Sequence, residues 1–311
     1  MVRPRSRKSP TRSRTAAAAP ALPDWGERLV GVHCSTAGGL ATGIERGAQL
    51  GCTAIQIFSK NNNRWLATPI HDDEVEAFQT ARANASIKLI FAHAGYLINL
   101  ASAERDITEQ SMESLRCELN RAYALGLAFV VLHPGAHKGD GELAGIRRIA
   151  DRLNILIEES GFSPVRIVLE GTAGQGTSIG HRFEHLRDIL GRIHDQHRVG
   201  VCLDTAHLFA AGYDFRTPKT YATLWDEFDR IVGRRQLCAL HLNDSKVGLG
   251  SHVDRHEHLG RGKIGPNGFR LLLRDATLAR LPMVCETPKG VTDALDRKNL
   301  AMIQQWIGTT K

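Results

Sequence analysis

Eight short apolar runs rich in β-branched residues recur along this chain, starting about 25 to 45 residues apart. Such runs are typical of parallel strands that are covered on both faces. Each interval is long enough for a helix, as in the amphipathic stretches 143–160 and 181–194. The runs are 29–33, 53–58, 87–93, 129–133, 166–170, 199–204, 238–241 and 281–286. Eight such units in succession predict an α/β fold, a closed (β/α)8 TIM barrel.

Polar residues stand at the ends of seven of these eight runs. The carboxyl ends of barrel strands all face one mouth, where the loops that follow them build the active site. A single histidine at a strand end is usually structural, but burying several imidazoles and carboxylates together is costly without metal ions or mutual pairing. The seven residues are His33, His93, His133, Glu170, Asp204, His241 and Glu286. They predict a functional site at the mouth of the barrel.

Two local pairs extend this set of candidate ligands. Asp204 and His207 are three residues apart, which places both on one side of a turn where a strand gives way to a helix. Asp254 and His256 are two apart, which places both on one face of an extended segment. Imidazole and carboxylate together suit zinc best, with manganese or iron as alternatives. We therefore expect a centre that binds divalent metal ions.

Several motifs resemble the endonuclease IV family of AP endonucleases, within the xylose-isomerase-like TIM barrel superfamily. The resemblance runs from about residue 29 to residue 306, and its motifs are HAGYLINL (93–100), LHPG (132–135), EGTAGQG (170–176), DTAH (204–207), HLND (241–244), VDRH (253–256) and CET (285–287). It implies a zinc-dependent deoxyribonuclease that acts in DNA base excision repair. Such an enzyme hydrolyses the phosphodiester 5′ to an abasic site and leaves a 3′-hydroxyl and a 5′-deoxyribose phosphate.

The resemblance also implies three zinc ions and a ligand set for each. Glu170 would bridge two of the ions and is the residue expected to be catalytic. The first set is His93, His133 and Glu170. The second is Glu170, Asp204, His241 and Glu286. The third is His207, Asp254 and His256. His33 and His137 fall outside this scheme, and we expect them to support the ligands or to pack beside them.

Two loops are expected to contact double-stranded DNA and to fill the gap left by a flipped abasic nucleotide. Tyr96 and Leu97 match one such loop of the family. The second loop, residues 59–65, departs from the family pattern, because Asn63 stands where the family has arginine and Arg64 follows it. Either Arg64 takes over the role of inserting into the gap, or this loop holds DNA less firmly.

Charge is concentrated at the amino terminus. The formal charge of the chain is +7, and residues 1–23 hold six Arg or Lys and no acidic residue. We expect residues 1–26 to form a disordered basic tail and residues 27–311 to form the endonuclease domain. The tail is open to three interpretations: a DNA-tethering arm, an organellar targeting peptide or a terminus without function.

Cysteine and hydropathy patterns bear on the compartment. The six cysteines are scattered singly and form no CxxC pair, which indicates free thiols and a reducing compartment. No apolar run approaches the roughly 18 residues of a membrane helix. We therefore expect a cytoplasmic protein, either of bacterial type or associated with the nucleoid, with no membrane partner. The resemblance to the endonuclease IV family implies a monomer.

Two other functions remain to be weighed. A sugar isomerase or epimerase of the xylose isomerase type would need only Glu170, Asp204, His241 and Glu286, and would leave the other candidate ligands without a role. A DNA-binding protein without activity would combine the basic tail with structural metal ions, but structural zinc prefers closed, cysteine-rich sites.

Overall fold

The computed structural model describes residues 22–161 and 163–308. Within them eight parallel strands close into a barrel, in the order β1-β10-β7-β6-β5-β4-β3-β2. The TIM barrel predicted from the sequence is therefore confirmed. The barrel strands are β1 (Val30–Cys34), β2 (Ala54–Phe58), β3 (Leu89–His93), β4 (Phe129–Leu132), β5 (Arg166–Glu170), β6 (Val199–Asp204), β7 (Leu237–His241) and β10 (Met283–Cys285).

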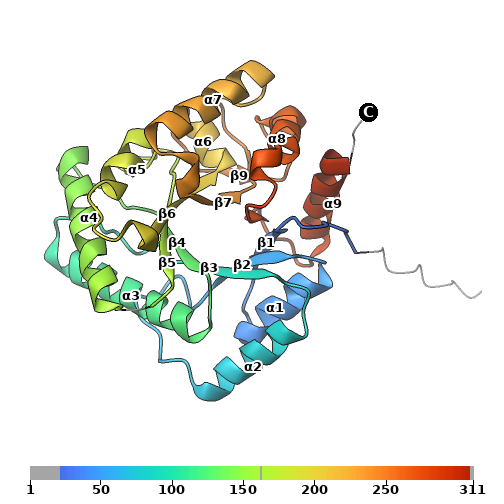
Figure 1. The fold of residues 1–311 in the computed structure, drawn as a ribbon. Coiled ribbons are helices and arrows are strands. Elements are labelled where there is room, and N and C mark those ends of the chain that lie inside the picture. The colour runs from blue at the N-terminus through green and yellow to red at the C-terminus, as the bar shows by residue number, and fades with distance from the viewer. Residues whose placement is uncertain (1–21, 162, 309–311) are drawn as a thin grey trace, which may run out of the picture.

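Helices follow the strands and form a ring outside them (Figure 1). They are α1 (Leu40–Gln49), α2 (Asp72–Ala83), α3 (Arg105–Ala124), α4 (Glu142–Glu159), α5 (Phe183–Leu190), α6 (Thr205–Ala211), α7 (Pro218–Ile231), α8 (Gly265–Arg274) and α9 (Ala294–Gly308). The ring closes where Arg297 of α9 donates to the carbonyl of Gln49 in α1, at 3.0 Å. The last helix therefore contacts the first and completes the ring around the barrel.

Side chains on each strand alternate between two apolar regions. One region lies between strands and helices and includes Ile90, Val130 and Leu169. The other fills the inside of the barrel with residues from six strands: Phe91, Phe129, Val131, Val168, Cys202, Ala239 and Val284. Because successive side chains point to opposite faces, the residue two positions after each inner apolar residue also points inward. These following positions are the polar strand ends, except that Phe129 is followed by Val131, which in turn is followed by His133.

A short antiparallel hairpin follows β7 and was not predicted. It pairs β8 (Asp244–Ser245) with β9 (His256–Glu257), and Ser245 stands opposite His256. Asp244 fixes the turn behind it, because its carboxylate accepts from the backbone nitrogens of Gly262 and Ile264, both at 3.0 Å. The hairpin brings His256 back from a long loop to the mouth of the barrel.

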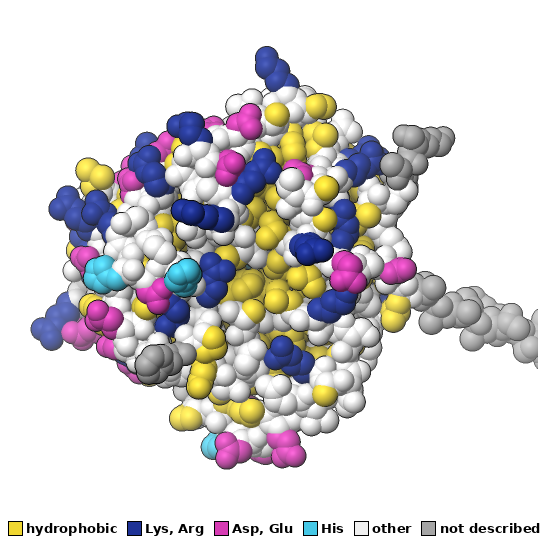
Figure 2. Space-filling model, in the orientation of Figure 1, with side chains coloured by type: hydrophobic (Ala, Val, Ile, Leu, Met, Phe, Trp, Pro, Cys, Tyr) yellow, Lys and Arg dark blue, Asp and Glu magenta, His cyan; other side chains and the backbone are white. Residues whose placement is uncertain are grey.

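The predicted basic tail, residues 1–26, lies mostly outside the described residues. Trp25, inside the predicted tail, is buried and donates from Nε1 to the carbonyl of Gly51 at 2.7 Å. The packing of the barrel therefore begins before residue 27. Among the described residues, no helix is both long and apolar enough to span a membrane. Figure 2 shows the molecule from the side of Figure 1, with hydrophobic side chains in the middle and Lys and Arg around them.

Candidate metal centre

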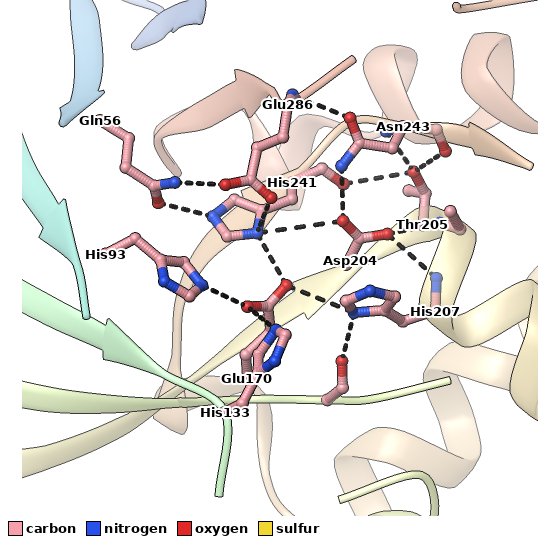
Figure 3. A network of polar contacts seen from close by, with 12 residues as sticks. Gln56, His93, His133, Glu170, Asp204, Thr205, His207, His241, Asn243 and Glu286 are labelled. Carbon is pink, nitrogen blue, oxygen red and sulfur yellow. Dashed lines mark hydrogen bonds and ion pairs between the residues drawn. The ribbon is translucent and has the colours of Figure 1, made fainter. Parts of the chain in front are cut away.

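Glu170, at the end of β5, lies in the middle of a cluster of imidazoles (Figure 3). One carboxylate oxygen, Oε2, lies 3.0 Å from Nε2 of His93 and 3.0 Å from Nε2 of His133. The other, Oε1, lies 2.8 Å from Nδ1 of His241. Glu170 is fully buried, and its two oxygens face two different groups of imidazoles. This is the arrangement that a carboxylate bridging two cations requires.

Two imidazoles of the cluster are oriented by a hydrogen bond from their outer nitrogen. His93 donates from Nδ1 to the carbonyl of Ala94 at 2.7 Å. His241 donates from Nε2 to the amide oxygen of Gln56 at 2.8 Å. A neutral imidazole carries one proton, so the nitrogen facing Glu170 is in each case the one with a free lone pair. Such outer bonds are usual for histidines that ligate metal ions.

The same arrangement recurs at the mouth between His207 and His256. His207 donates from Nδ1 to the carbonyl of Gly171 at 2.9 Å, and His256 donates from Nδ1 to the carbonyl of Glu286 at 3.3 Å. Their Nε2 atoms lie 3.4 Å apart. Asp254 adds one carboxylate oxygen 3.2 Å from each Nε2. Two lone pairs and a carboxylate that converge in this way need a cation or protons between them.

Asp204 belongs to both the strand and the helix that follows. Its Oδ1 accepts from the backbone nitrogens of Ala206 and His207, at 2.6 and 3.0 Å, and so caps the start of α6. Its Oδ2 is left to face the cluster, 3.6 Å from Nε2 of His256 and 4.0 Å from Nδ1 of His241. The cap fixes the orientation of the carboxylate without using the oxygen that could bind a metal ion.

The structure brings all nine predicted ligand residues to this mouth. In each of three groups the potential ligand atoms lie within 4.8 Å of one another. The first two groups have the predicted members, His93–His133–Glu170 and Glu170–Asp204–His241–Glu286. The third joins His207 and His256 to Asp204, with Asp254 against both imidazoles. Asp204 thus faces two groups rather than the one assigned from the sequence.

The electrostatics of the cluster follow from gathering four carboxylates, of which Glu170 and Asp204 are fully buried and Glu286 and Asp254 are partly exposed. Burial alone would raise the pKa of the Glu170 and Glu286 carboxyls, but His241 and its neighbours hold both well below the ordinary value. Burial would lower the pKa of His256, yet Asp204 and Asp254 raise it to about 9. The cluster therefore attracts positive charge, which divalent cations on this set of imidazole and carboxylate donors would supply.

Two residues that support the centre were missed from the sequence. Gln56, within the run AIQIF of β2, is fully buried; besides accepting from His241 it donates to Nδ1 of His33 at 2.8 Å and to Glu286. Asn243 donates to Asp204 and accepts from the backbone nitrogen of Glu286 at 2.8 Å. The sequence could have indicated Gln56, because it is a polar residue in the middle of an otherwise apolar strand. His33, expected beside the ligands, does lie there.

The predicted DNA-contacting residues lie at the rim. Tyr96 and Leu97 are among the exposed large hydrophobic residues, and the Tyr96 ring lies 5.7 Å from the His93 ring. Both line a cavity of about 740 Å³ that reaches His133, His207 and Asp254. In the loop of residues 59–65, Trp65 lines this cavity. Asn63 and Arg64, which precede Trp65 in the chain, are exposed.

One further His/Glu group lies apart from the centre, formed by Glu142, His181 and His185. The guanidinium of Arg182 already occupies it, with Nη2 2.6 Å from Glu142 Oε2 and 2.9 Å from His185 Nε2. Moreover, Nδ1 of His185 lies 3.2 Å from the backbone nitrogen of Gly180, which donates to it. The positive charge of Arg182 would repel a metal cation, so this group is a poor metal site.

Comparisons with known proteins show the family to which the chain belongs. A family model described as xylose isomerase-like TIM barrel matches residues 44–306. A probable endonuclease 4 from Chloroflexus aggregans is 46% identical over 280 residues, which cover 90% of this chain and 98% of that protein. A probable endonuclease 4 from Geotalea daltonii is 43% identical and covers 89% of this chain and 98% of its own length.

Among solved structures, endonuclease IV from Thermus thermophilus superposes with a TM-score of 0.80 at 36% identity, over 91% of this chain and all of that one. A D-tagatose 3-epimerase-like protein reaches a TM-score of 0.69 at 19% identity, over 89% of this chain and 97% of its own. The second likeness concerns the fold alone.

Proposed function

This chain belongs to the endonuclease 4 family of xylose isomerase-like TIM barrels and is a nuclease, and from that premise we propose that it repairs DNA by cutting the backbone 5′ to abasic sites. The products would be a 3′-hydroxyl and a 5′-deoxyribose phosphate. The identity of the relatives supports an endonuclease acting on DNA. The abasic substrate is inferred from the site itself, and the position of the cut is what the resemblance to the AP endonucleases implies.

The observation that carries the proposal is the size of the cluster around Glu170. A sugar epimerase of this fold needs four strand-end ligands, the group formed by Glu170, Asp204, His241 and Glu286. Two further groups adjoin it here, one through Glu170 and one through Asp204. An extended cationic centre suits a phosphodiester, whose attacking and leaving oxygens must be stabilised together.

The residues present fit three divalent cations, and zinc is the ion that this mixture of imidazole and carboxylate favours. His93 and His133 would hold the first, His241 and Glu286 the second, and His207, Asp254 and His256 the third. Glu170 would be shared by the first two, and Asp204 would contribute to the second. When bound, the ions would supply the positive charge that activates water and neutralises the phosphate.

The chain's own residues would select the substrate. An abasic nucleotide has lost the stacking and pairing of one base, so swinging it out of the duplex costs less than for an intact nucleotide. The cavity beside the cluster has room for the extruded sugar and its phosphates, and Tyr96 and Leu97 stand at its rim. These apolar side chains would fill the gap in the stack while Glu170 and its neighbours hold the phosphodiester.

Three substrates separate this proposal from its alternatives. We expect nicking of a duplex that carries one abasic site and no nicking of the intact duplex of the same sequence. A chelator should abolish the nicking and added zinc should restore it. Ends mapped on a sequencing gel should show a 3′-hydroxyl on the 5′ side of the lesion. Turnover of a ketose without nicking would favour an epimerase, and DNA binding without nicking would favour a non-enzymatic protein.

A further inference from the structure

Two loops at the rim share one buried ion pair behind them. Strand β2 leads into the loop of residues 59–65, and the adjacent strand β3 leads into the segment 94–97. Glu118 of α3 lies beneath both, with its Oε1 3.3 Å from Nζ of Lys60. Each of these side chains is only 1% exposed. Charged side chains usually lie at the surface, so an ion pair buried beneath two exposed loops suggests a structural role for the pair.

Every remaining polar contact of this pair goes to one of the two loops. Ser59 donates its hydroxyl to Glu118 Oε2. The backbone nitrogen of Gly95 donates to Glu118 Oε1 at 3.1 Å. Lys60 donates from Nζ to the carbonyl of Arg64 at 2.7 Å. The Glu118 carboxylate therefore holds the start of both loops. Lys60 holds the end of the loop of residues 59–65 through the Arg64 carbonyl.

The loops also touch each other where they meet the ion pair. A Cβ placed on Gly95 would lie 3.1 Å from the carbonyl oxygen of Asn62 and 3.4 Å from Nζ of Lys60, so only glycine fits without displacement. Arg121, the next residue along this face of α3, donates to the carbonyls of Ser59 and Thr68 at 2.8 and 2.7 Å. Movement of one loop would therefore disturb the other.

We propose that Glu118 is a positioning residue that holds the two loops as a single unit, so that Tyr96 and Leu97 of one loop and Arg64 of the other reach the same gap in the DNA. The inference rests on the proposed function, since it concerns how that substrate is gripped. Glu118 touches neither the cavity lining nor the metal-binding groups. Its effect passes through Lys60 and Gly95, which fix where the loop tips stand.

The test replaces Glu118 by glutamine, which keeps the shape but removes the charge that holds Lys60. Asp296→Asn is the matched control, because Asp296 of α9 is also a buried carboxylate paired to a lysine, Lys289, at 2.8 and 2.9 Å. Both variants lose one carboxylate charge and one lysine contact. Only the first loses a connection to the two loops.

Loop order can be read without any DNA. Of the four tryptophans, Trp25, Trp225 and Trp306 are buried, whereas Trp65 lies half-buried in the loop of residues 59–65. Acrylamide quenching of the intrinsic fluorescence therefore reports mainly on Trp65. We expect stronger quenching in Glu118→Gln than in the wild type, and no change in Asp296→Asn.

On an abasic duplex, Glu118→Gln should raise KM roughly tenfold and leave kcat at saturating DNA and the metal content unchanged, because misplaced loops weaken binding rather than the chemistry. Wild-type quenching together with wild-type KM in Glu118→Gln would overturn the proposal. An equal rise of KM in Asp296→Asn would also overturn it, because the effect would then follow from the loss of any buried carboxylate.

A second variant keeps the inference testable if Glu118→Gln does not fold. Lys60→Met combined with Glu118→Gln leaves no unpaired buried charge and should fold, yet it still lacks the tie to the Arg64 carbonyl. Raised quenching and raised KM in this double variant support the proposal, and wild-type values refute it. If the wild type fails to nick abasic DNA, the proposed function falls, while the quenching comparison still decides whether Glu118 couples the loops.

Discussion

The candidate metal centre and the two rim loops, residues 59–65 and 94–97, lie side by side at one mouth, but their side chains are positioned in different ways. At the centre, Glu170, Asp204 and His241 are fully buried and sit at the last inward position of a strand. On the loops, Tyr96 is 59% exposed and Arg64 is exposed on a turn closed by its backbone nitrogen and the Asn61 carbonyl. The geometry of the strands positions the residues of the centre. The buried contacts of Glu118 and Lys60 beneath the loops position the residues of the loops.

This difference teaches where changes should act. Residues of the centre mainly contact one another and inward side chains such as Gln56, so changes there should alter metal binding and turnover. In the proposed function the residues of the loops contact the DNA, so changes there should alter binding of DNA and leave the metal ions in place. Changes in the centre should therefore lower kcat, and changes in the loops should raise KM.

The largest effect is expected from Glu170→Gln, which removes the charge shared by His93, His133 and His241. Nicking of the abasic duplex should fall by at least about a hundredfold and bound metal should decrease. Glu142→Gln is the control, because that carboxylate also faces two imidazoles but lies outside the centre. Wild-type nicking with full metal content in Glu170→Gln would break the separation of the two regions.

Gln56→Leu tests whether the inner wall of the barrel belongs to the centre. The change keeps the volume but removes the acceptor for His241 Nε2 and the donors to His33 and Glu286. We expect metal affinity or kcat to fall about 10- to 100-fold, as measured by competition with a chelating dye. Ile57→Leu, a volume-conserving change on the same strand, should have little effect on either quantity. Equal effects of the two changes would mean that Gln56 only fills space.

Arg64→Ala and Asn63→Ala sharpen the comparison from the loop side. A guanidinium can stack in the gap of the duplex and reach a phosphate, and stacking on a base is worth about 1–3 kcal/mol. We expect Arg64→Ala to raise KM for the abasic duplex several-fold more than Asn63→Ala does, with metal content unchanged in both. Small and equal effects would leave Tyr96 and Leu97 to fill the gap alone.

The smallest effect is expected from deleting residues 1–21, which removes six basic residues and spares the buried Trp25. Their charge should add sequence-independent affinity for DNA that falls as salt rises. The truncated protein should bind more weakly at low salt, show a shallower salt dependence and keep its turnover at saturating DNA. An unchanged salt slope would favour a targeting peptide or a terminus without function.

The barrel and most of the centre could be predicted from the sequence, because regularly spaced apolar runs indicate the strands and the carboxyl ends of barrel strands share one mouth. Strand ends such as His93, Asp204 and Glu286 are polar interruptions of apolar runs and stand out. The hairpin that returns His256 was less visible, since its strands are only two residues long. Asp204 was assigned to one group because the sequence does not reveal that helix capping turns its second oxygen toward His256.

Glu118 could not have been singled out from the sequence. It is one of three glutamates within helix α3, and the other two, Glu109 and Glu113, are exposed. Its meaning depends on which residues lie opposite it. Lys60 comes from the preceding strand–helix unit, and Gly95 lies 23 residues earlier, in the loop before α3. Tertiary contacts of this kind leave no local pattern.

The most direct measurement is the number of metal ions per chain, determined by mass spectrometry on purified protein that is assayed for nicking in the same preparation. We predict close to three zinc ions per chain, loss of nicking on a duplex with one abasic site when they are chelated, and recovery when zinc is returned. Full nicking of that duplex by protein with one metal ion or none would contradict a three-metal centre at this mouth.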